Sequence, residues 1–200
     1  MINRCWHLNS PIYCKFINNL NLQRQYVSIT NQNADRSDIS ELVNLINTAY
    51  RGGASKKGWT TEADLVSGNR VNEISLAELF NTANIIFRKC LDDRSQIVGC
   101  SCLEKRSMEL YTSLLTVSPE MQDCGVGKML LIDAEEIAMA SGLPSLALTV
   151  ISARTELIDY YLRRGFQRTG NIFDFPINSS GSRPLRELQL AELRKFIDVA

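Results

Sequence analysis

The spacing of apolar residues changes several times along the chain, and each change marks a predicted element. Residues 26–30 alternate between apolar and polar positions, as in a strand with one buried face. The next apolar residues recur every three or four positions, at Ile39, Leu42, Val43, Ile46 and Ala49. This spacing predicts an amphipathic helix that follows a cap-rich turn and ends before Gly52.

Three β-prone runs occupy the middle of the chain, over residues 84–91, 96–104 and 109–117. The two turns between them are short and polar, which predicts that neighbouring strands run antiparallel. A short helix is expected near residues 74–80, just before the first of these strands. The middle of the chain therefore predicts an antiparallel meander.

A helix–strand–helix pattern follows the meander. One helix is expected from Val126 to Ser141 and a buried strand over residues 146–151. A second helix, over residues 155–164, stops at a glycine, and a further strand begins over residues 166–169. The element order predicts an α/β (α+β) fold, in which helices flank a mixed, mostly antiparallel sheet.

The length of 200 residues fits one domain with an additional segment. Residues 1–25 are broken by several asparagines and read as an irregular N-terminal extension, whose order the pattern does not reveal. Residues 26–200 are expected to form the single domain. The oligomeric state is not readable from the sequence, and the extension is a candidate for exchange between two copies in a homodimer.

Composition narrows the class of function. The 22 basic and 22 acidic residues balance to a formal net charge of zero, which argues against nucleic acid as the main partner. No apolar run is long enough to span a membrane, and the N-terminus is a poor signal peptide. The six cysteines contain no Cys-x-x-Cys pair and are expected to be buried free thiols of a cytoplasmic protein. His7 is the one histidine, so a histidine triad, a Cys-His pair or a multi-histidine zinc site must use it or not exist, and no metal is expected.

The segment from Leu115 to Lys128 carries the clearest chemical signal. A predicted strand runs into a turn with Gly125 and Gly127, and the turn opens a helix. Free backbone N–H groups and the helix dipole make such a turn a phosphate-binding site. The alternative is a tight strand–helix turn with no ligand. A Walker loop is excluded, and a dinucleotide fingerprint is incomplete because Leu130 stands where a third glycine or alanine belongs.

Two motifs resemble the GCN5-related N-acetyltransferase (GNAT) family. Gln122-x-x-Gly125-x-Gly127 is similar to the acetyl-CoA loop of that family, and Tyr161-Leu162-Arg163-Arg164-Gly165-Phe166 to its later Tyr-x-x-x-Gly-Phe segment. The resemblance implies a sheet that splays after its fourth strand and transfer of an acetyl group from acetyl-CoA to a primary amine of a small molecule or peptide. It also implies a final strand near Arg186–Leu193, although local propensity slightly favours a helix there.

The same resemblance assigns the cofactor contacts. Leu115 and Val117 would offer main-chain groups to the pantetheine arm, in the manner of an added strand. The diphosphate would be held by the backbone amides of the glycine turn, which are those of Gln122, Asp123, Cys124, Gly125, Val126, Gly127 and Lys128.

The resemblance also places the proton chemistry. Tyr161 stands where many members keep a tyrosine that protonates the leaving thiolate, and the alternative is a packing tyrosine on the inner face of its helix. The glutamate that histone-type members use as a base is replaced here by Tyr111. Glu109, Glu104 and an ordered water are the remaining candidates for the base. The missing glutamate leaves a non-catalytic acyl-CoA-binding module on the same fold as the alternative function.

Acceptor selection in this family falls to the loop between the first helices and to the late hairpin, here residues 50–70 and 170–184. Tyr50, Trp59, Glu62 and Asp64 are expected to form an aromatic and acidic pocket for a cationic amine, joined by Tyr111 from the meander. The alternative is a solvated loop. Arg154 departs from the asparagine that many members have at this position, which puts a hydrogen bond of that asparagine in doubt.

Overall fold

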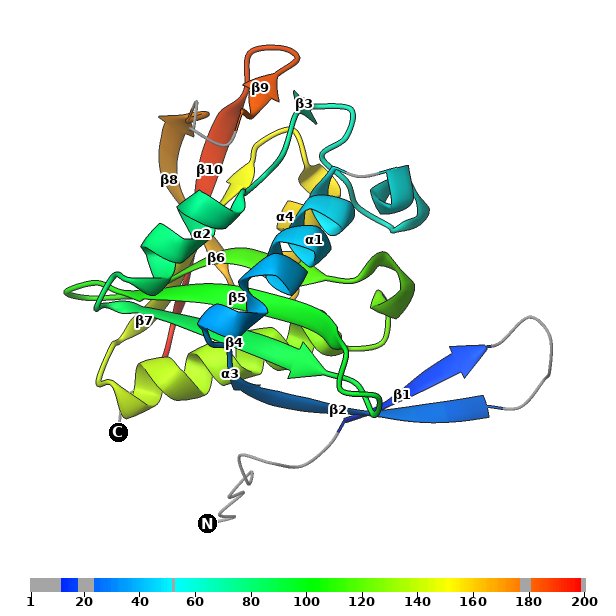
Figure 1. Cartoon of the computed structure of the whole chain (residues 1–200). Helices are drawn as coiled ribbons and strands as arrows, with labels where there is room; N and C mark the ends of the chain where they lie inside the picture. Colours follow the sequence, from blue (N-terminus) through cyan, green and yellow to red (C-terminus); the bar gives the residue numbers. More distant parts are fainter. Residues whose placement is uncertain (1–11, 18–23, 52, 177–180, 199–200) are drawn as a thin grey trace.

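The structure is a computed structural model that describes residues 12–17, 24–51, 53–176 and 181–198. Side chains are described from residue 28 onward, except that of Lys57. Within these residues an eight-stranded sheet has the order β1-β2-β4-β5-β6-β7-β10-β8, and a separate two-stranded ribbon pairs β3 with β9 (Figure 1). The strands are β1 (Ile12–Ile17), β2 (Arg24–Asn33), β3 (Val66–Ser67), β4 (Ile85–Leu91), β5 (Ile97–Lys105), β6 (Leu110–Val117), β7 (Ser145–Ile151), β8 (Gln167–Asp174), β9 (Arg183–Pro184) and β10 (Gln189–Phe196).

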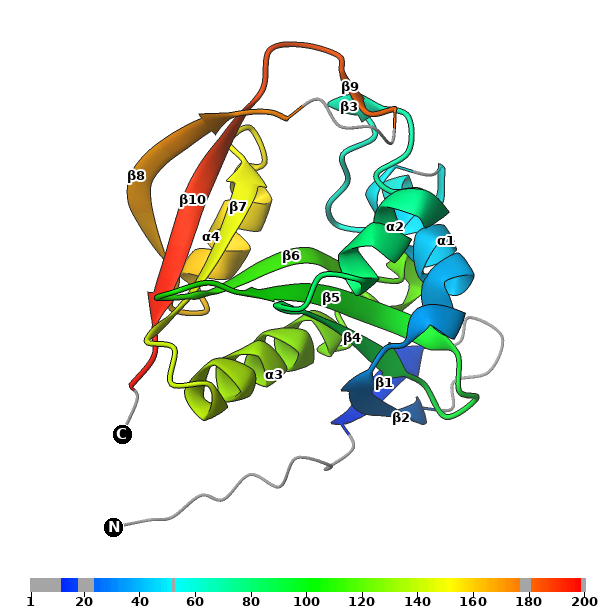
Figure 2. The same cartoon turned by 60° about the vertical axis from the view of Figure 1, so that its left-hand side comes forward.

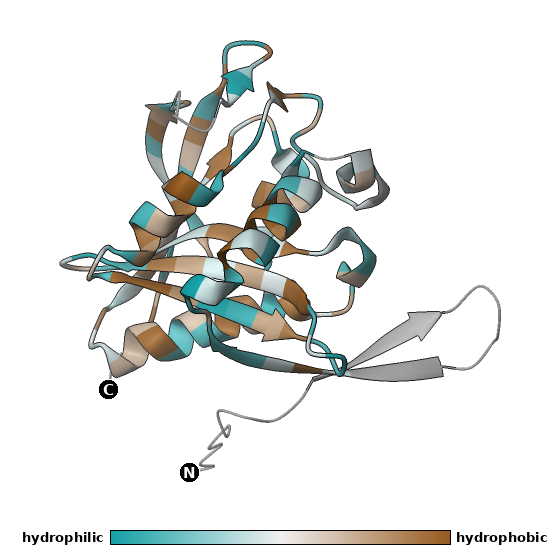
Figure 3. Ribbon diagram, viewed as in Figure 1, coloured by the Kyte–Doolittle hydropathy of each residue, from teal (hydrophilic) through white to brown (hydrophobic). Residues whose placement is uncertain are grey.

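Four α-helices lie on the two faces of the large sheet. They are α1 (Ile39–Tyr50), α2 (Glu73–Phe80), α3 (Val126–Ala140) and α4 (Thr155–Leu162). α1 and α2 cover one face of the meander β4-β5-β6, and α3 covers the other (Figure 2). The strands at the centre of the sheet are largely hydrophobic, because both of their faces are covered (Figure 3). The predicted α/β fold with a mixed, mostly antiparallel sheet is confirmed.

The sheet opens between β6 and β7. These strands run parallel and pair only at Leu110 with Leu146 and at Tyr111 with Ala147, after which they diverge. Figure 2 shows the two halves of the sheet separating from this point. Leu114 has a φ of 47°, and the β5–β6 register shifts next to it, so β6 is bulged where it faces the opening. The divergence leaves strand edges that are not joined to each other.

The last two strands of the large sheet, β8 and β10, follow β7 in the order β7-β10-β8. β10 pairs antiparallel with both β7 and β8, which buries Leu193 and Ala191 in the sheet. The final strand is thus present against its local helix propensity, three residues later than the expected Arg186–Leu193. β8 begins at Gln167, within the expected start at residues 166–169, and it continues to Asp174 because β10 supplies hydrogen-bond partners along its length.

Two features of the described chain were not expected from the sequence. β1 lies within the range read as irregular, and it pairs antiparallel with β2. The ribbon β3–β9 joins the α1–α2 loop to the segment before β10, and the Leu185 N–H donates to the Leu65 carbonyl at 2.9 Å. Local periodicity gives no signal for either pairing, because β3 and β9 have two residues each and are far apart in sequence, and β1 lies in a segment without clear alternation.

Three cysteines match the expectation of free buried thiols, namely Cys90, Cys100 and Cys102. Burial raises the pKa of each of these thiols, and that of Cys102 to about 11. Cys124 is disulfide-bonded, so the expectation of a free thiol is wrong at that position. None of the helices in the described part of the chain is both long and apolar enough to cross a membrane.

Candidate active site

A cavity of about 630 Å³ occupies the opening between β6 and β7. Its walls come from the α1–α2 loop, β6, the N-terminus of α3, β7 and α4. Phe175 and Pro176 complete the lining at the side of the late hairpin. Because these segments are far apart in sequence, the cavity exists only in the folded chain.

One end of the cavity is the glycine turn before α3. Gly125 is the residue before the helix and has a φ of 84°, a conformation that residues with a side chain rarely adopt. Asp123 shares this left-handed conformation, with a φ of 63°. The first N–H groups of α3 have no acceptor within the helix, and the helix dipole makes this end positive. The expected turn residues that line the cavity are Gln122, Asp123, Gly125, Val126, Gly127 and Lys128, whereas Cys124 does not line it.

Aromatic and basic side chains from α4 and from the residues just after it lie next to this turn. The Arg164 guanidinium lies 3.4 Å from the centroid of the Tyr160 ring, and the Tyr160 hydroxyl faces Gly127. A Cβ on Gly127 would lie only 2.7 Å from that hydroxyl, so the close approach requires glycine. Lys128, Arg163 and Arg164 all line the cavity. The residues of this end suit a polyanionic phosphate group.

The α1–α2 loop reaches across to the same turn. The Trp59 N–H donates to the Gln122 Oε1 at 2.9 Å, and the Trp59 and Tyr160 rings lie 5.4 Å apart. A Cβ on Gly58 would lie 2.5 Å from Gln122 Oε1, so this contact also depends on a glycine. The Gln122 side chain therefore binds the loop in this structure.

The open edge of β6 forms the middle of the cavity. Leu115 and Val117 line it, and the Tyr50 hydroxyl donates to the Leu115 carbonyl at 3.2 Å. Thr112 is almost fully buried, and its Oγ1 has no hydrogen-bond partner among the described residues. A buried hydroxyl without a partner is costly, and a ligand in the cavity would supply one. The edge thus fits a chain of amide groups such as pantetheine.

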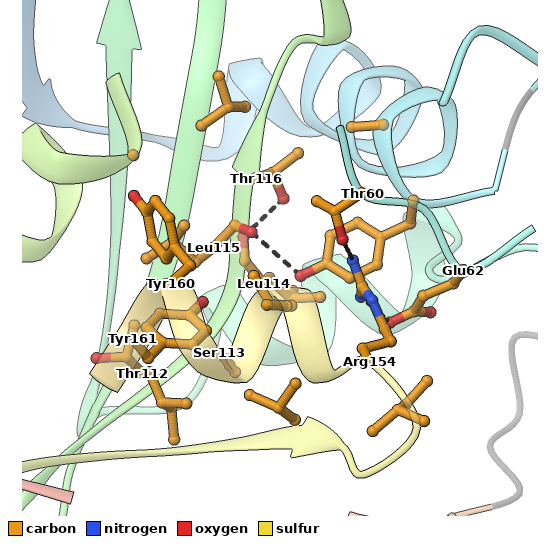
Figure 4. A pocket seen from close by; sticks show the side chains of 18 of the residues that line it. Thr60, Glu62, Thr112, Ser113, Leu114, Leu115, Thr116, Arg154, Tyr160 and Tyr161 are labelled. Atoms are coloured by element: carbon orange, nitrogen blue, oxygen red, sulfur yellow. Dashed lines mark hydrogen bonds and ion pairs between the residues drawn. The ribbon is translucent and has the colours of Figure 1, made fainter. Parts of the chain in front are cut away.

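Tyr161 projects from α4 into the cavity lining. Its side chain is only 6% exposed and packs edge-on against Tyr160 and Phe166. Burial raises the pKa of the Tyr161 phenol, because the charged form is desolvated there. Tyr161 therefore stays protonated and can donate a hydrogen bond into the cavity. Figure 4 shows Tyr160 and Tyr161 next to each other, with Thr112 and Ser113 of β6 beside Tyr161 in this view.

The two glutamates considered as bases lie outside the cavity lining. Glu104 pairs with Arg106 at 2.8 Å, and Glu109 pairs with Arg194 at 2.8 Å. Tyr111 does line the cavity, and its hydroxyl shares a hydrogen bond of 2.8 Å with Thr149. This bond links β6 to β7 at the point where they diverge.

A buried charge network forms the other end of the cavity. Glu62 is 6% exposed and lies between two arginines, with Arg154 Nη1 at 3.1 Å and Arg51 Nη2 at 3.2 Å. Arg154 also donates to Thr60 Oγ1 at 2.6 Å. In Figure 4, Thr60, Glu62 and Arg154 lie together on the side opposite the two tyrosines. The network ties the α1–α2 loop to the start of α4.

The structure brings most of the expected acceptor residues together, but not all of them. Tyr50, Trp59, Glu62 and Tyr111 line the cavity, whereas Asp64 is exposed and pairs with Lys56 at 2.9 Å. Sequence reasoning missed the arginines that line or adjoin this end, which are Arg51, Arg70 and Arg154. The departure from asparagine at position 154 was the one available signal. Among the described residues, no group of three or more histidine, cysteine or acidic side chains is placed to hold a metal ion.

Solved structures of acetyltransferases share this fold. The ribosomal-protein-S18-alanine N-acetyltransferase from Escherichia coli is 14% identical, with a TM-score of 0.64 over 86% of this chain and 96% of that one. A phosphinothricin acetyltransferase from Sinorhizobium meliloti, in complex with AcCoA, is 18% identical, with a TM-score of 0.62 over 84% and 88%. A chimera of the Vibrio cholerae spermidine N-acetyltransferase SpeG is also 18% identical, with a TM-score of 0.62 over 84% and 95%.

No curated protein matches the sequence. The model of the GNAT acetyltransferase family, in contrast, matches residues 41–166, which is more than half of the chain. The matched range includes the glycine turn, the open edge of β6 and Tyr161. The chain belongs to the GNAT family of acetyltransferases.

Proposed function

We propose that this chain transfers an acetyl group from acetyl-CoA to a primary amine of a small molecule or peptide. One observation supports the proposal above the others: a single cavity joins the glycine turn of α3, the open edge of β6 and the buried Tyr161. The diphosphate would lie on the amides of residues 122–128, and the pantetheine arm along Leu115 and Val117. This arrangement would leave the thioester near the middle of the cavity.

The reaction forms a C–N bond and breaks a C–S bond at the thioester carbonyl. The acceptor amine must first be neutral, although a lysine-like amine has a pKa of about 10.4. The departing sulfur then needs a proton, and Tyr161, kept neutral by burial, is the group that supplies it in this proposal. Water afterwards restores the phenol.

The route by which the amine loses its proton differs from the expectation. Glu104 and Glu109 are paired with arginines outside the cavity lining, and Glu62 is held between Arg51 and Arg154. We therefore assign this step to water in the cavity rather than to a carboxylate. Without a strong base the reaction should accelerate as pH rises toward the pKa of the acceptor amine.

Asp123 of the lining belongs to the glycine turn, and Glu62 at the other end is held by arginines, which also favours the second candidate, a non-catalytic acyl-CoA-binding module. Such a module would bind acetyl-CoA and release no CoA.

The proposal includes a cytoplasmic location, which the buried free thiols support and the disulfide at Cys124 opposes. Cell fractionation would decide that point.

The test is release of free thiol from acetyl-CoA over a panel of amines, with mass spectrometry of the acetylated product. The proposal predicts turnover with at least one amine and a matching acetylated product. Acetyl-CoA binding without turnover on any amine would favour the binding module. Failure to bind acetyl-CoA at all would contradict both candidates.

A further inference from the structure

We infer that Tyr50 is a positioning residue for the acyl group, because its hydroxyl holds the carbonyl of Leu115 and leaves the Leu115 N–H to bind the oxygen of the thioester. This inference rests on the proposed function and deepens it by assigning a residue of the same site. Tyr50 then serves the acyl group rather than the acceptor amine, to which the sequence pattern assigned it. The basis is an irregular stretch of β6 beside the opening.

The irregular stretch of β6 is a bulge. Two of its residues, Leu114 and Leu115, lie opposite one residue of β5, where the register of the two strands shifts. Leu114 has a φ of 47°, in the left-handed region that residues with a side chain rarely adopt. Backbone in such a conformation persists only where the surrounding contacts hold it. Contacts that hold this bulge are therefore expected nearby.

The main-chain groups of Leu115 face the opening and not β5. The Ser118 N–H donates to a carbonyl of β5, that of Val98, at 2.8 Å. Main-chain groups along an antiparallel strand point to alternate sides, so those of Thr116 also face β5, whereas those of Val117 and Leu115 face the other way. That other side is the opening, because within the described chain β7 pairs with β6 only at the first two residues of β6.

Side-chain hydroxyls bind both carbonyls of the bulge. Thr116 Oγ1 donates to the Leu114 carbonyl at 2.7 Å, and the Tyr50 hydroxyl donates to the Leu115 carbonyl at 3.2 Å. Tyr50 is itself anchored at the end of α1, where its own carbonyl accepts the Glu62 N–H at 2.9 Å. Burial raises the pKa of Tyr50 to about 12, so its hydroxyl keeps the proton and stays a donor at neutral pH.

The opening is thus left with a hydrogen-bond donor at Leu115. Because the carbonyl of this residue is already bound, its N–H is the group that can bind a ligand there. An acyl-CoA thioester offers a carbonyl oxygen, which gains negative charge during transfer and then binds such a donor more strongly. In Figure 4, Leu115 lies between the two tyrosines of α4 and Arg154. The oxygen would then be held near Tyr161, the proposed proton donor to the sulfur.

The experiment compares the affinities of acetyl-CoA and CoA, because only acetyl-CoA has the thioester oxygen. Calorimetric titration of the wild type and of Tyr50→Phe with each compound needs no turnover. We expect Tyr50→Phe to bind acetyl-CoA about fivefold more weakly and to bind CoA as the wild type does. An equal loss for both compounds, or no loss for either, would overturn the inference. If the wild type binds neither compound, the proposed function fails and the inference fails with it.

Ser145→Ala is the matched control. Ser145 is buried and its Oγ donates to the backbone carbonyl of Met108 at 3.1 Å, but Ser145 lies outside the described cavity lining. Each substitution removes one hydrogen bond from a hydroxyl to a backbone carbonyl, so urea unfolding should show similar small losses of stability. Only Tyr50→Phe should change the ratio of the two affinities. The same change of ratio in Ser145→Ala would overturn the inference.

Steady-state kinetics separate positioning of the acyl group from binding of the acceptor. Tyr50→Phe should lower kcat about 10-fold and leave the KM for the amine nearly unchanged. Thr116→Val removes the bond to the other carbonyl of the bulge and should show the same pattern to a smaller degree, whereas Thr116→Ser should restore it. A raised KM for the amine at unchanged kcat in Tyr50→Phe would make Tyr50 an acceptor residue and overturn the inference.

Discussion

The two ends of the cavity are built in opposite ways. The end at α3 is a continuous stretch of chain, residues 118–128, whose backbone conformation makes the site through left-handed residues and free N–H groups. The other end is assembled from side chains of the α1–α2 loop and the start of α4, held by Glu62 between Arg51 and Arg154. One end depends on local geometry and the other on long-range charge pairing.

The two ends of the cavity therefore contribute differently to substrate specificity. A backbone site recognises a group that all substrates share, because it uses no particular side chain. A side-chain network over distant loops can change its selectivity through single substitutions without disturbing the backbone site. We therefore expect substitutions at the two ends to affect different kinetic parameters.

The largest expected effect comes from breaking the charge network. Glu62→Gln keeps the shape of the side chain but leaves the buried Arg51 without its carboxylate and Arg154 with only the exposed Glu156, which should lower the free energy of unfolding by about 3 kcal/mol. Urea unfolding measures the change. Asp64→Asn is the control, because its ion pair with Lys56 is exposed and should contribute less than about 1 kcal/mol. Similar losses in both variants would mean that the network does not hold this end.

Removing the proton donor between the two ends should have the next largest effect. Tyr161→Phe keeps the ring packing against Phe166 and should lower kcat by about 100-fold, with little change in the KM for acetyl-CoA. Steady-state thiol release measures both parameters. Tyr160→Phe is the neighbouring control and should retain most of kcat. Unchanged kcat in Tyr161→Phe would remove the tyrosine from the chemistry.

The burial of Tyr50 predicts a loss of stability at high pH. Burial raises the pKa of Tyr50 to about 12, so the unfolded chain releases this proton near pH 10 while the folded chain still keeps it. Stability should therefore fall as pH rises from about 10 to about 12, by roughly 1.4 kcal/mol per pH unit. Unfolding measured at about pH 9 and about pH 11 should show a smaller fall in Tyr50→Phe. An identical fall in both proteins would show that Tyr50 is not the group responsible.

The smallest effect is expected at the backbone end. Gly125→Ala would force a residue with a side chain into a φ of 84°, which should weaken acetyl-CoA binding about fivefold, equivalent to about 1 kcal/mol. Calorimetric titration measures the affinity. Gly53→Ala is the control, because an added Cβ there meets nothing within 4 Å. If the KM for the acceptor amine also changed in Gly125→Ala, the two ends would not be independent.

The sequence predicts the fold well wherever local patterns decide it. Periodicity and short polar turns place the meander, and α1 and α3 begin at the expected residues. The ends of elements are less exact: α4 stops at Leu162 rather than at residue 164. β1 and the β3–β9 ribbon were missed, because pairing with a distant or weakly patterned segment defines them.

The candidate site likewise has one part that the sequence predicts and another part that it does not. The glycine turn and Tyr161 are visible in the sequence, because each belongs to a short motif whose spacing is fixed by the local chain. The pairing of Glu62 with Arg51 and Arg154 joins residues up to 92 positions apart, so no spacing reveals it. Likewise Glu104 and Glu109 are close in sequence to the open edge of β6, yet their side chains pair with Arg106 and Arg194 outside the cavity lining.

The central claim is that the opening between β6 and β7 holds acetyl-CoA, and its most direct test is calorimetric titration of the purified full chain with acetyl-CoA. We predict saturable binding with one molecule per chain, weakened in Gly125→Ala and unchanged in Gly53→Ala. Absence of binding, or binding that both substitutions leave unchanged, would contradict the claim.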